Sequence, residues 1–277
     1  MFLFATELVM SQSKSCCSDV EHSASMSSTE KFASFGNDME FVSLHDAPLP
    51  FKLTDGKGKM ITFKTADGKT GSAYEVKPDN AGNKYLLVFH EWWGLNDYIK
   101  QEAEKFQSEL GDVTVLAVDL YDGKVASTQD EASKYVQEVE TNRAVNIING
   151  AMDYAGSNAV FGTLGWCFGG TWSLQAAMLL GDKCKACIMY YGMPEQDLTK
   201  LAMLKAPVLG NFGKKDSHIT PAIVEKFEQN LKDLNISSDI KEYDAVHAFA
   251  NPSNPKHDPD ATKDAMERSL KFLKERL

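Results

Sequence analysis

Cys167 is the residue of this 277-residue chain whose setting best suits nucleophilic chemistry. It lies in GTLGWCFGGTWS (162–173), between an apolar run and a helix-like run, with glycines on both sides. In a strand–turn–helix elbow the nucleophile takes strained backbone angles, and the residues two positions away must be small. The positive end of the helix would favour the thiolate, which is the attacking form. The alternative is a buried structural cysteine beside glycines that serve packing alone.

A cysteine nucleophile needs a base, and the base needs a group that orients it. Asp216 follows the apolar run PVLGNFG (207–213), and His247 follows SSDIKEY (237–243). The chain order nucleophile, acid, histidine is that of hydrolases with a nucleophile elbow. We therefore expect Asp216 and His247 to serve Cys167, although either alone would suit a turn aspartate or a loop histidine. His218 is expected at the rim of the site, and His257 in solvent.

A third group of candidates follows the apolar run YLLVFH (85–90) in the sequence. The backbone N–H groups of Trp92 and Phe168 are expected to form an oxyanion hole. Glu91 has apolar neighbours, so it is expected to keep a raised pKa and to exchange a proton with Cys167. Trp93 would line the substrate cleft. The alternative is that Glu91 is a solvated loop carboxylate and that the tryptophans belong to the core.

These residues need a scaffold, and the chain supplies a regular one from residue 59 onward. Strand-like runs alternate with helix-like runs, which predicts an α/β fold with a mostly parallel, twisted sheet and helices on both faces. Active groups gather at the carboxyl ends of such strands. The expected strands are 59–65, 71–77, 85–90, 113–119, 159–165, 186–192, 207–213 and 237–243, and the expected helices are 98–110, 129–155, 169–180, 221–234 and 260–276.

The first fifth of the chain has a different composition. Residues 11–30 hold eight serines and few apolar groups, and such a segment buries too little surface to offset its ordering entropy. We therefore expect a flexible, acidic, Ser-rich extension over 1–50 and a single α/β-hydrolase domain over 51–277.

The overall charge limits the partners. The formal net charge is -10, which argues against nucleic acid, because phosphate binding needs a basic face. No run approaches the roughly 20 apolar residues of a membrane span. The first ten residues contain Glu7 and lack a basic flank, so we expect a cytoplasmic protein. Export is the alternative, if these residues are the remainder of a signal peptide. A monomer is expected.

The five cysteines do not suggest a disulfide framework, because their number is odd and their spacing irregular. Cys184 and Cys187 have CxxC spacing but read as the start of a buried strand, and no second CxxC accompanies them for zinc. Cys16 and Cys17 lie in the Ser-rich stretch, where they are either without structure or a reactive vicinal pair.

Together, these motifs make residues 58–277 resemble the dienelactone hydrolase family. The stretches that carry the resemblance are HEWWG, VLAVDLYDG, GWCFGG, YYG, FGKKDSHITP and VHAFANP, in that order. The resemblance implies an α/β-hydrolase fold and hydrolysis of lactones and esters. It also implies that Cys167 is the nucleophile, His247 the base and Asp216 its partner. Glu91 would hold the resting thiol and take its proton when substrate binds.

The sequence departs from the family where substrate is bound. Well-studied members hold the substrate carboxylate with two arginines, one of them four residues after the histidine, where this chain has Asn251. The other lies in the polar helical region before the elbow, where 124–142 has none and Arg143 comes too late. We therefore expect Asn251 to contact substrate and the substrate not to be dienelactone itself.

The function expected from the sequence is hydrolysis of a small ester or lactone by Cys167, without a cofactor or metal. One alternative is a broader carboxylesterase or thioesterase. The other is a non-catalytic protein that senses electrophiles or redox state through the Cys167 thiol.

Overall fold

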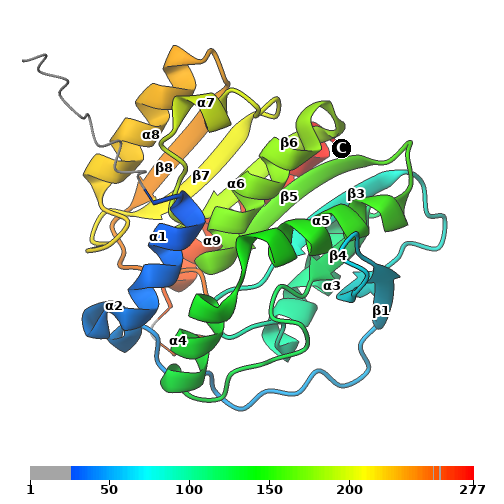
Figure 1. Ribbon diagram of the computed structural model, residues 1–277, viewed down its shortest axis with the longest axis horizontal. Coiled ribbons are helices and arrows are strands. Elements are labelled where there is room, and N and C mark those ends of the chain that lie inside the picture. The colour runs from blue at the N-terminus through cyan, green and yellow to red at the C-terminus, as the bar shows by residue number, and fades with distance from the viewer. Residues whose placement is uncertain (1–25, 252, 256) are drawn as a thin grey trace, which may run out of the picture.

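The structure is a computed structural model, and it describes residues 26–277 except 252 and 256 (Figure 1). The described strands form one eight-stranded sheet in the order β1-β2-β4-β3-β5-β6-β7-β8. The β1–β2 and β2–β4 pairs are antiparallel, and every other neighbouring pair is parallel. The strands are β1 (Lys59–Lys64), β2 (Thr70–Val76), β3 (Lys84–Phe89), β4 (Thr114–Val118), β5 (Val160–Trp166), β6 (Cys184–Tyr190), β7 (Val208–Gly213) and β8 (Ser238–Tyr243).

Helices cover both faces of the sheet. Helices α3 and α9 pack against each other on one face, and α5 and α6 cover the other (Figure 1). This arrangement is the α/β-hydrolase fold and confirms the predicted fold class. The helices are α1 (Ser28–Ser34), α2 (Met39–Ser43), α3 (Asp97–Leu110), α4 (Gln129–Glu138), α5 (Thr141–Ala155), α6 (Phe168–Leu180), α7 (Leu198–Leu201), α8 (Pro221–Asp233) and α9 (Pro259–Lys274), with 3-10 turns η1 (Phe35–Asn37) and η2 (Gly181–Lys183).

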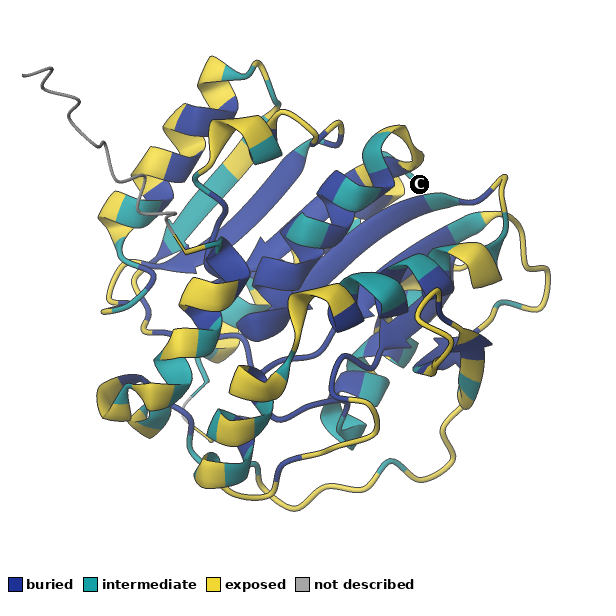
Figure 2. Cartoon of the chain, viewed as in Figure 1, coloured by how far each residue is buried: buried dark blue, intermediate teal, exposed yellow. Residues whose placement is uncertain are grey.

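The central strands are buried on both faces, as their continuous apolar runs predict. All five residues of β4 are buried, and so are five of the six in β3. Figure 2 shows the sheet as the buried layer, with exposed residues on the outer sides of the helices. The burial of these strands makes the sheet a rigid base for the loops at its carboxyl edge.

One predicted helix is two helices in the structure. The stretch 129–155 is interrupted at Val139 and Glu140, whose backbones are extended, with ψ angles of 105° and 125°. The polar periodicity continues across the break, so the pattern alone did not mark it.

The expectation of a flexible extension over 1–50 is wrong for residues 27–45. Helices α1 and α2 pack on the domain, and Phe32 and Phe41 are fully buried. A capping box at Ser27 and Glu30 starts α1, and Asp38 caps α2. The many serines lowered the average hydropathy of the stretch, so the average did not reveal that each helix has one face with a buried phenylalanine. The folded domain therefore begins before residue 51.

The remaining N-terminal predictions lie outside the described residues, including those for Cys16 and Cys17. Within the part that is described, no helix combines the length and the apolar character needed to cross a membrane.

Candidate active site

The nucleophile elbow has the geometry that the sequence predicts. Cys167 separates β5 from α6 with a φ of 57° and a ψ of -119°, a strained conformation for a residue other than glycine. A Cβ atom on Gly165 would lie 2.0 Å from the Gly169 carbonyl oxygen, and one on Gly169 would lie 2.2 Å from the Phe89 oxygen. Only glycine fits either position, and the turn projects Cys167 above the carboxyl edge of the sheet.

The predicted triad residues lie together at this edge. His247 Nε2 lies 3.4 Å from Cys167 Sγ, and His247 Nδ1 lies 2.6 Å from Asp216 Oδ2. Asp216 follows β7, and His247 follows β8. The other oxygen of Asp216 accepts hydrogen bonds from the backbone N–H groups of His218 and Ile219. Both carboxylate oxygens are thus engaged, which holds the His247 ring in place.

The charge on Asp216 is compatible with its burial. Burial alone would raise the pKa of this carboxyl, but the charge and hydrogen bond of His247 and the two backbone N–H groups outweigh it, so the pKa lies below its usual value. A carboxylate here fixes the His247 tautomer, with the proton on Nδ1 and the lone pair of Nε2 facing the sulfur.

The Cys167 thiol is protonated at rest. Its side chain is fully buried, and burial raises its pKa well above the usual value; an ionised Glu91 would raise it further. The backbone N–H groups of Phe168 and Trp92 act in the opposite direction. The helix N-terminus that was expected to favour the thiolate is therefore outweighed by the loss of solvent.

The same two N–H groups are those predicted for the oxyanion hole. Both interact with the sulfur of Cys167, one from the residue that follows it and one from the loop after β3. When a substrate carbonyl carbon bonds to this sulfur, the carbonyl oxygen comes to lie beside the same N–H donors. The loop is further held by the Tyr121 hydroxyl, which donates to the Trp92 carbonyl at 3.3 Å.

Glu91 is buried and forms a small hydrogen-bonded ring with Asn251 and Ser253. The Asn251 amide donates to Glu91 Oε2, and Ser253 Oγ lies 3.1 Å from Glu91 Oε1 and 2.7 Å from Asn251 Oδ1. The Ser253 hydroxyl has one proton for two acceptors, so a protonated Glu91 completes the ring. Burial raises the pKa of Glu91 to about 8, although the hydrogen bonds of Ser253 and Asn251 act in the opposite direction.

This ring changes how the predicted roles are read. Glu91 hydrogen bonds to Asn251 and Ser253, whereas the sulfur of Cys167 faces His247. The Asn251 amide, which was expected to contact substrate, is occupied by Glu91 in this conformation. Trp93 is fully buried, so it contacts substrate only if the site opens.

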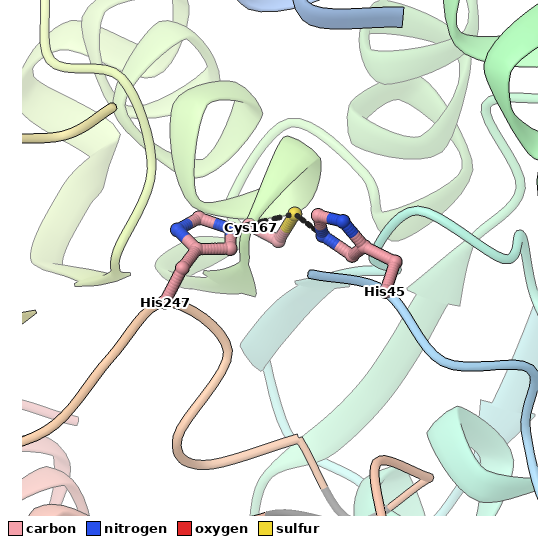
Figure 3. A group of neighbouring side chains, drawn as sticks. All are labelled: His45, Cys167 and His247. Carbon is pink, nitrogen blue, oxygen red and sulfur yellow. Dashed lines mark hydrogen bonds between the residues drawn. The ribbon is translucent and has the colours of Figure 1, made fainter. Parts of the chain in front are cut away.

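Sequence reasoning missed His45. It follows α2, and its Nε2 atom lies 3.5 Å from Cys167 Sγ, so that the sulfur contacts the imidazoles of both His45 and His247 (Figure 3). Its Nδ1 lies 2.9 Å from the Phe41 carbonyl oxygen. Burial, together with the charge of His247, lowers the pKa of His45 to about 3. Phe41, four residues earlier in a Ser-rich stretch, was the available signal that this segment docks on the domain.

The N-terminal helices close the site. Phe41 packs against His247 and Trp92, with ring centroids 5.0 Å and 5.5 Å apart. Asp38, at the start of α2, accepts from His218 Nε2 at 3.1 Å, so His218 joins the Asp216 loop to this segment. The triad side chains are consequently sealed from solvent.

Cys184, Cys187 and His257 lie apart from this site. Cys184 and Cys187 are buried, and neither forms a disulfide. Burial raises the pKa of both thiols, which disfavours the reactive thiolate. His257 is half-buried, with Nδ1 3.2 Å from the Asn254 carbonyl oxygen, rather than fully in solvent.

The Arg143 guanidinium forms ion pairs with Asp122 and Asp67.

The sequence and the architecture of this chain are similar to those of known proteins. Residues 72–277 match the model of the dienelactone hydrolase family. The chain is 28% identical over 233 residues to "Protein usf" of Aquifex pyrophilus, covering 79% of this chain and 99% of that protein. It is 25% identical over 236 residues to carboxymethylenebutenolidase 1 of Cupriavidus pinatubonensis, covering 80% and 97%.

A solved structure shares the fold. The putative dienelactone hydrolase of Klebsiella pneumoniae superposes with a TM-score of 0.65 at 23% identity, covering 78% of this chain and 98% of that one. The family match spans well over half of the chain and includes the elbow, the acid and the histidine. This chain is therefore a hydrolase that belongs to the dienelactone hydrolase family.

Proposed function

We propose that this protein hydrolyses uncharged esters or lactones with Cys167 as the nucleophile. The observation that carries the proposal is the continuous series from Cys167 Sγ through His247 to Asp216, with spacings of 3.4 Å and 2.6 Å. It supplies a nucleophile, a base within reach of the nucleophile's proton, and a carboxylate that orients the base.

Acylation uses the resting thiol. His247 Nε2 takes the Cys167 proton as the sulfur attacks the carbonyl carbon, and Asp216 stabilises the imidazolium that forms. The carbonyl oxygen becomes an oxyanion that accepts from the N–H groups of Trp92 and Phe168, an effect worth about 3 kcal/mol for each donor. The leaving alkoxide takes the proton from His247, and a thioester on Cys167 remains.

Deacylation repeats these roles with water. His247 removes a proton from a water molecule, the hydroxide attacks the thioester carbonyl, and the same two N–H groups stabilise the second oxyanion. The Cys167 thiolate leaves and regains its proton from His247. The carboxylic acid is released, and no group outside the chain is consumed except water.

Glu91 is proposed as a neutral acid beside this reaction. Its raised pKa keeps it protonated near neutral pH, so it adds no negative charge next to the forming thiolate. To accept the Cys167 proton, as the family resemblance implies, Glu91 would first have to leave Asn251 and Ser253. Glu91 would exchange Asn251 and Ser253 for the Cys167 thiol when substrate binds beside the loop after β3.

The preference for uncharged substrates follows from the charges near the sulfur. The carboxyls near the sulfur are Asp216, whose lowered pKa keeps it charged, and Glu91, which becomes charged only if it loses its proton. Asn251 is a neutral amide and is already engaged. A buried substrate carboxylate costs several kcal/mol unless it is paired, and these neighbours offer it no cation.

Substrate reaches Cys167 only when the covering segment moves. The sulfur, the His247 ring and the Trp92 indole are buried beneath α2 and His45. Displacing Phe41 and His45 would open the face of the elbow and free the space beside the two N–H donors. Opening and closing of a loop or segment over the active site is a recurrent step in enzymes.

The test is hydrolysis of p-nitrophenyl acetate by the full chain and by its Cys167→Ala variant. Sustained turnover that Cys167→Ala abolishes, with an unchanged melting temperature, supports the proposal. Cys187→Ala is the matched control and should keep its turnover. A single stoichiometric burst from the wild type would instead favour an electrophile sensor, and full activity in Cys167→Ala would remove Cys167 from the mechanism.

A further inference from the structure

We propose that His45, Cys167 and His247 form a binding site for a zinc ion, which would lock the nucleophile and hold the N-terminal segment closed. The three ligand atoms are His45 Nε2, Cys167 Sγ and His247 Nε2, and all lie within 4.8 Å of one another (Figure 3). The proposal goes beyond hydrolysis, and only its effect on turnover rests on the proposed function.

The two sulfur–nitrogen distances suit zinc, whereas the two nitrogens, which lie within 4.8 Å of each other, would approach to about 3.4 Å to share one tetrahedral ion. Sγ lies 3.5 Å from His45 Nε2 and 3.4 Å from His247 Nε2. Zinc binds thiolate sulfur at about 2.3 Å and imidazole nitrogen at about 2.0–2.1 Å, so two such tetrahedral ligands lie about 3.5 Å apart. Thiolate and imidazole are both ligand types that zinc takes in proteins, and three protein ligands leave the fourth tetrahedral position to water.

The orientation of both rings leaves the nitrogen lone pairs facing the sulfur. His45 Nδ1 faces the Phe41 carbonyl oxygen, and His247 Nδ1 faces the Asp216 carboxylate. Both partners are acceptors, so each neutral ring carries its proton on Nδ1. A carbonyl or carboxylate behind a histidine is the usual arrangement that orients a zinc ligand.

The Cys167 thiol has too few protons to form a hydrogen bond with both neighbouring imidazoles. The Cys167 thiol donates one hydrogen bond, yet two acceptor nitrogens lie within 3.5 Å of it. With both rings neutral, one nitrogen faces the sulfur without a hydrogen between them. A cation among the three atoms would engage all three lone pairs. On binding, the thiol proton is released to solvent, and a sulfur–zinc bond replaces the S–H bond.

The site would connect two parts of the chain. Cys167 and His247 come from the hydrolase sheet, and His45 comes from the segment after α2. A zinc ion there would occupy the sulfur that must attack the carbonyl, and it would fasten the segment that covers the site. Removal of zinc would release both.

The test is titration of the full chain with zinc and with cobalt(II) as a spectroscopic probe. It is done in a background in which Cys16→Ser and Cys17→Ser remove two other thiols. We expect one ion per chain, measured by competition with a chromogenic chelator, and a sulfur-to-cobalt charge-transfer band in the near ultraviolet. Zinc should also raise the melting temperature.

Two ligand variants and two controls locate the ion. His45→Ala and Cys167→Ala should each weaken zinc affinity by at least about tenfold and should reduce or remove the cobalt band. His257→Ala and Cys187→Ala should leave both unchanged. The proposal would be overturned if both ligand variants kept the wild-type affinity for zinc. It would also be overturned if the chain with His45, Cys167 and His247 intact gave no sulfur–cobalt band. Neither outcome depends on the variants being active.

The outcomes separate this site from the proposed function. If zinc binds and metal-free protein hydrolyses no ester, the zinc site stands and the hydrolase proposal fails. If metal-free protein turns over and equimolar zinc neither binds nor inhibits, the hydrolase proposal stands and the zinc site fails.

Discussion

The imidazole of His45 stacks on the indole of Trp92, with ring centroids 4.8 Å apart and ring planes 19° apart. A residue from the N-terminal segment therefore lies directly against Trp92, whose backbone N–H is the proposed oxyanion donor. The position next to that donor is where the carbonyl of a substrate must sit. The closed arrangement and the productive one thus exclude each other, which makes the segment the first target for experiment.

Phe41→Ala should loosen this segment and expose the nucleophile. Phe41 is fully buried, and replacement of a buried phenylalanine by alanine costs about 3–5 kcal/mol. We expect a lower melting temperature and faster alkylation of Cys167 by iodoacetamide, followed by mass spectrometry of the peptide. Phe51→Ala, at a side chain that is 38% exposed, is the control. Equal alkylation rates in the two variants would contradict a covering role for Phe41.

Glu91 should make stability depend on pH. Its folded-state pKa is raised to about 8 from 4.5, so between these values the folded chain keeps a proton that the unfolded chain has lost. The free energy of unfolding should therefore fall as pH rises from about 4.5 to about 8, by at most about 1.4 kcal/mol per pH unit. Above pH 8, Glu91 should add no further dependence on pH.

Glu91→Gln isolates this contribution. The amide cannot ionise, so urea unfolding at a series of pH values should give a difference, wild type minus variant, that declines from pH 5 to pH 8. Glu109→Gln, on the outer part of α3, serves as the control. A difference that stays constant with pH would show that Glu91 titrates at its ordinary value.

Asp216→Asn should impair catalysis more than it impairs folding. The asparagine carbonyl can still accept from the N–H groups of His218 and Ile219, but its amide would face His247 Nδ1 and reverse the tautomer. Turnover should fall about a thousandfold to ten-thousandfold, as when this position is neutralised in other triads. The assay is kcat for p-nitrophenyl acetate beside a melting curve. Activity within tenfold of the wild type would show that Asp216 does not set the His247 tautomer.

The charges near Cys167 predict the preferred substrate. In a matched pair of esters that differ only by a carboxylate, the uncharged member should have the larger kcat/KM by at least about tenfold, which is about 1.4 kcal/mol. Each value is divided by the rate of hydroxide hydrolysis to correct for intrinsic reactivity. Preference for the anionic member would mean that a cation enters the site when it opens.

Local sequence patterns predict the strands of the sheet, the elbow at Cys167 and the residues that lie near it. The buried parallel strands appear as continuous apolar runs such as YLLVFH, and the elbow appears as glycines that flank Cys167. Asp216 and His247 could be paired with Cys167 because residues that follow parallel strands meet at one edge of the sheet. Each of these inferences depends only on neighbours in the chain and on the topology that the alternation of elements implies.

The place of the N-terminal segment is decided only by tertiary structure. His45 and Cys167 are 122 positions apart, and the contact depends on how Phe32 and Phe41 fit against the finished domain. No periodicity in residues 26–50 encodes that fit, and the surrounding serines lower the average hydropathy.

The protonation of the site follows the same rule. The sequence placed Glu91 and Cys167 near each other but favoured a thiolate, because a helix N-terminus is a local feature. Burial raises the pKa of Glu91, as its apolar neighbours predicted, and it also raises the pKa of the Cys167 thiol, which reverses the expected thiolate. Desolvation depends on every element packed around a group, so it exists only once the chain has folded.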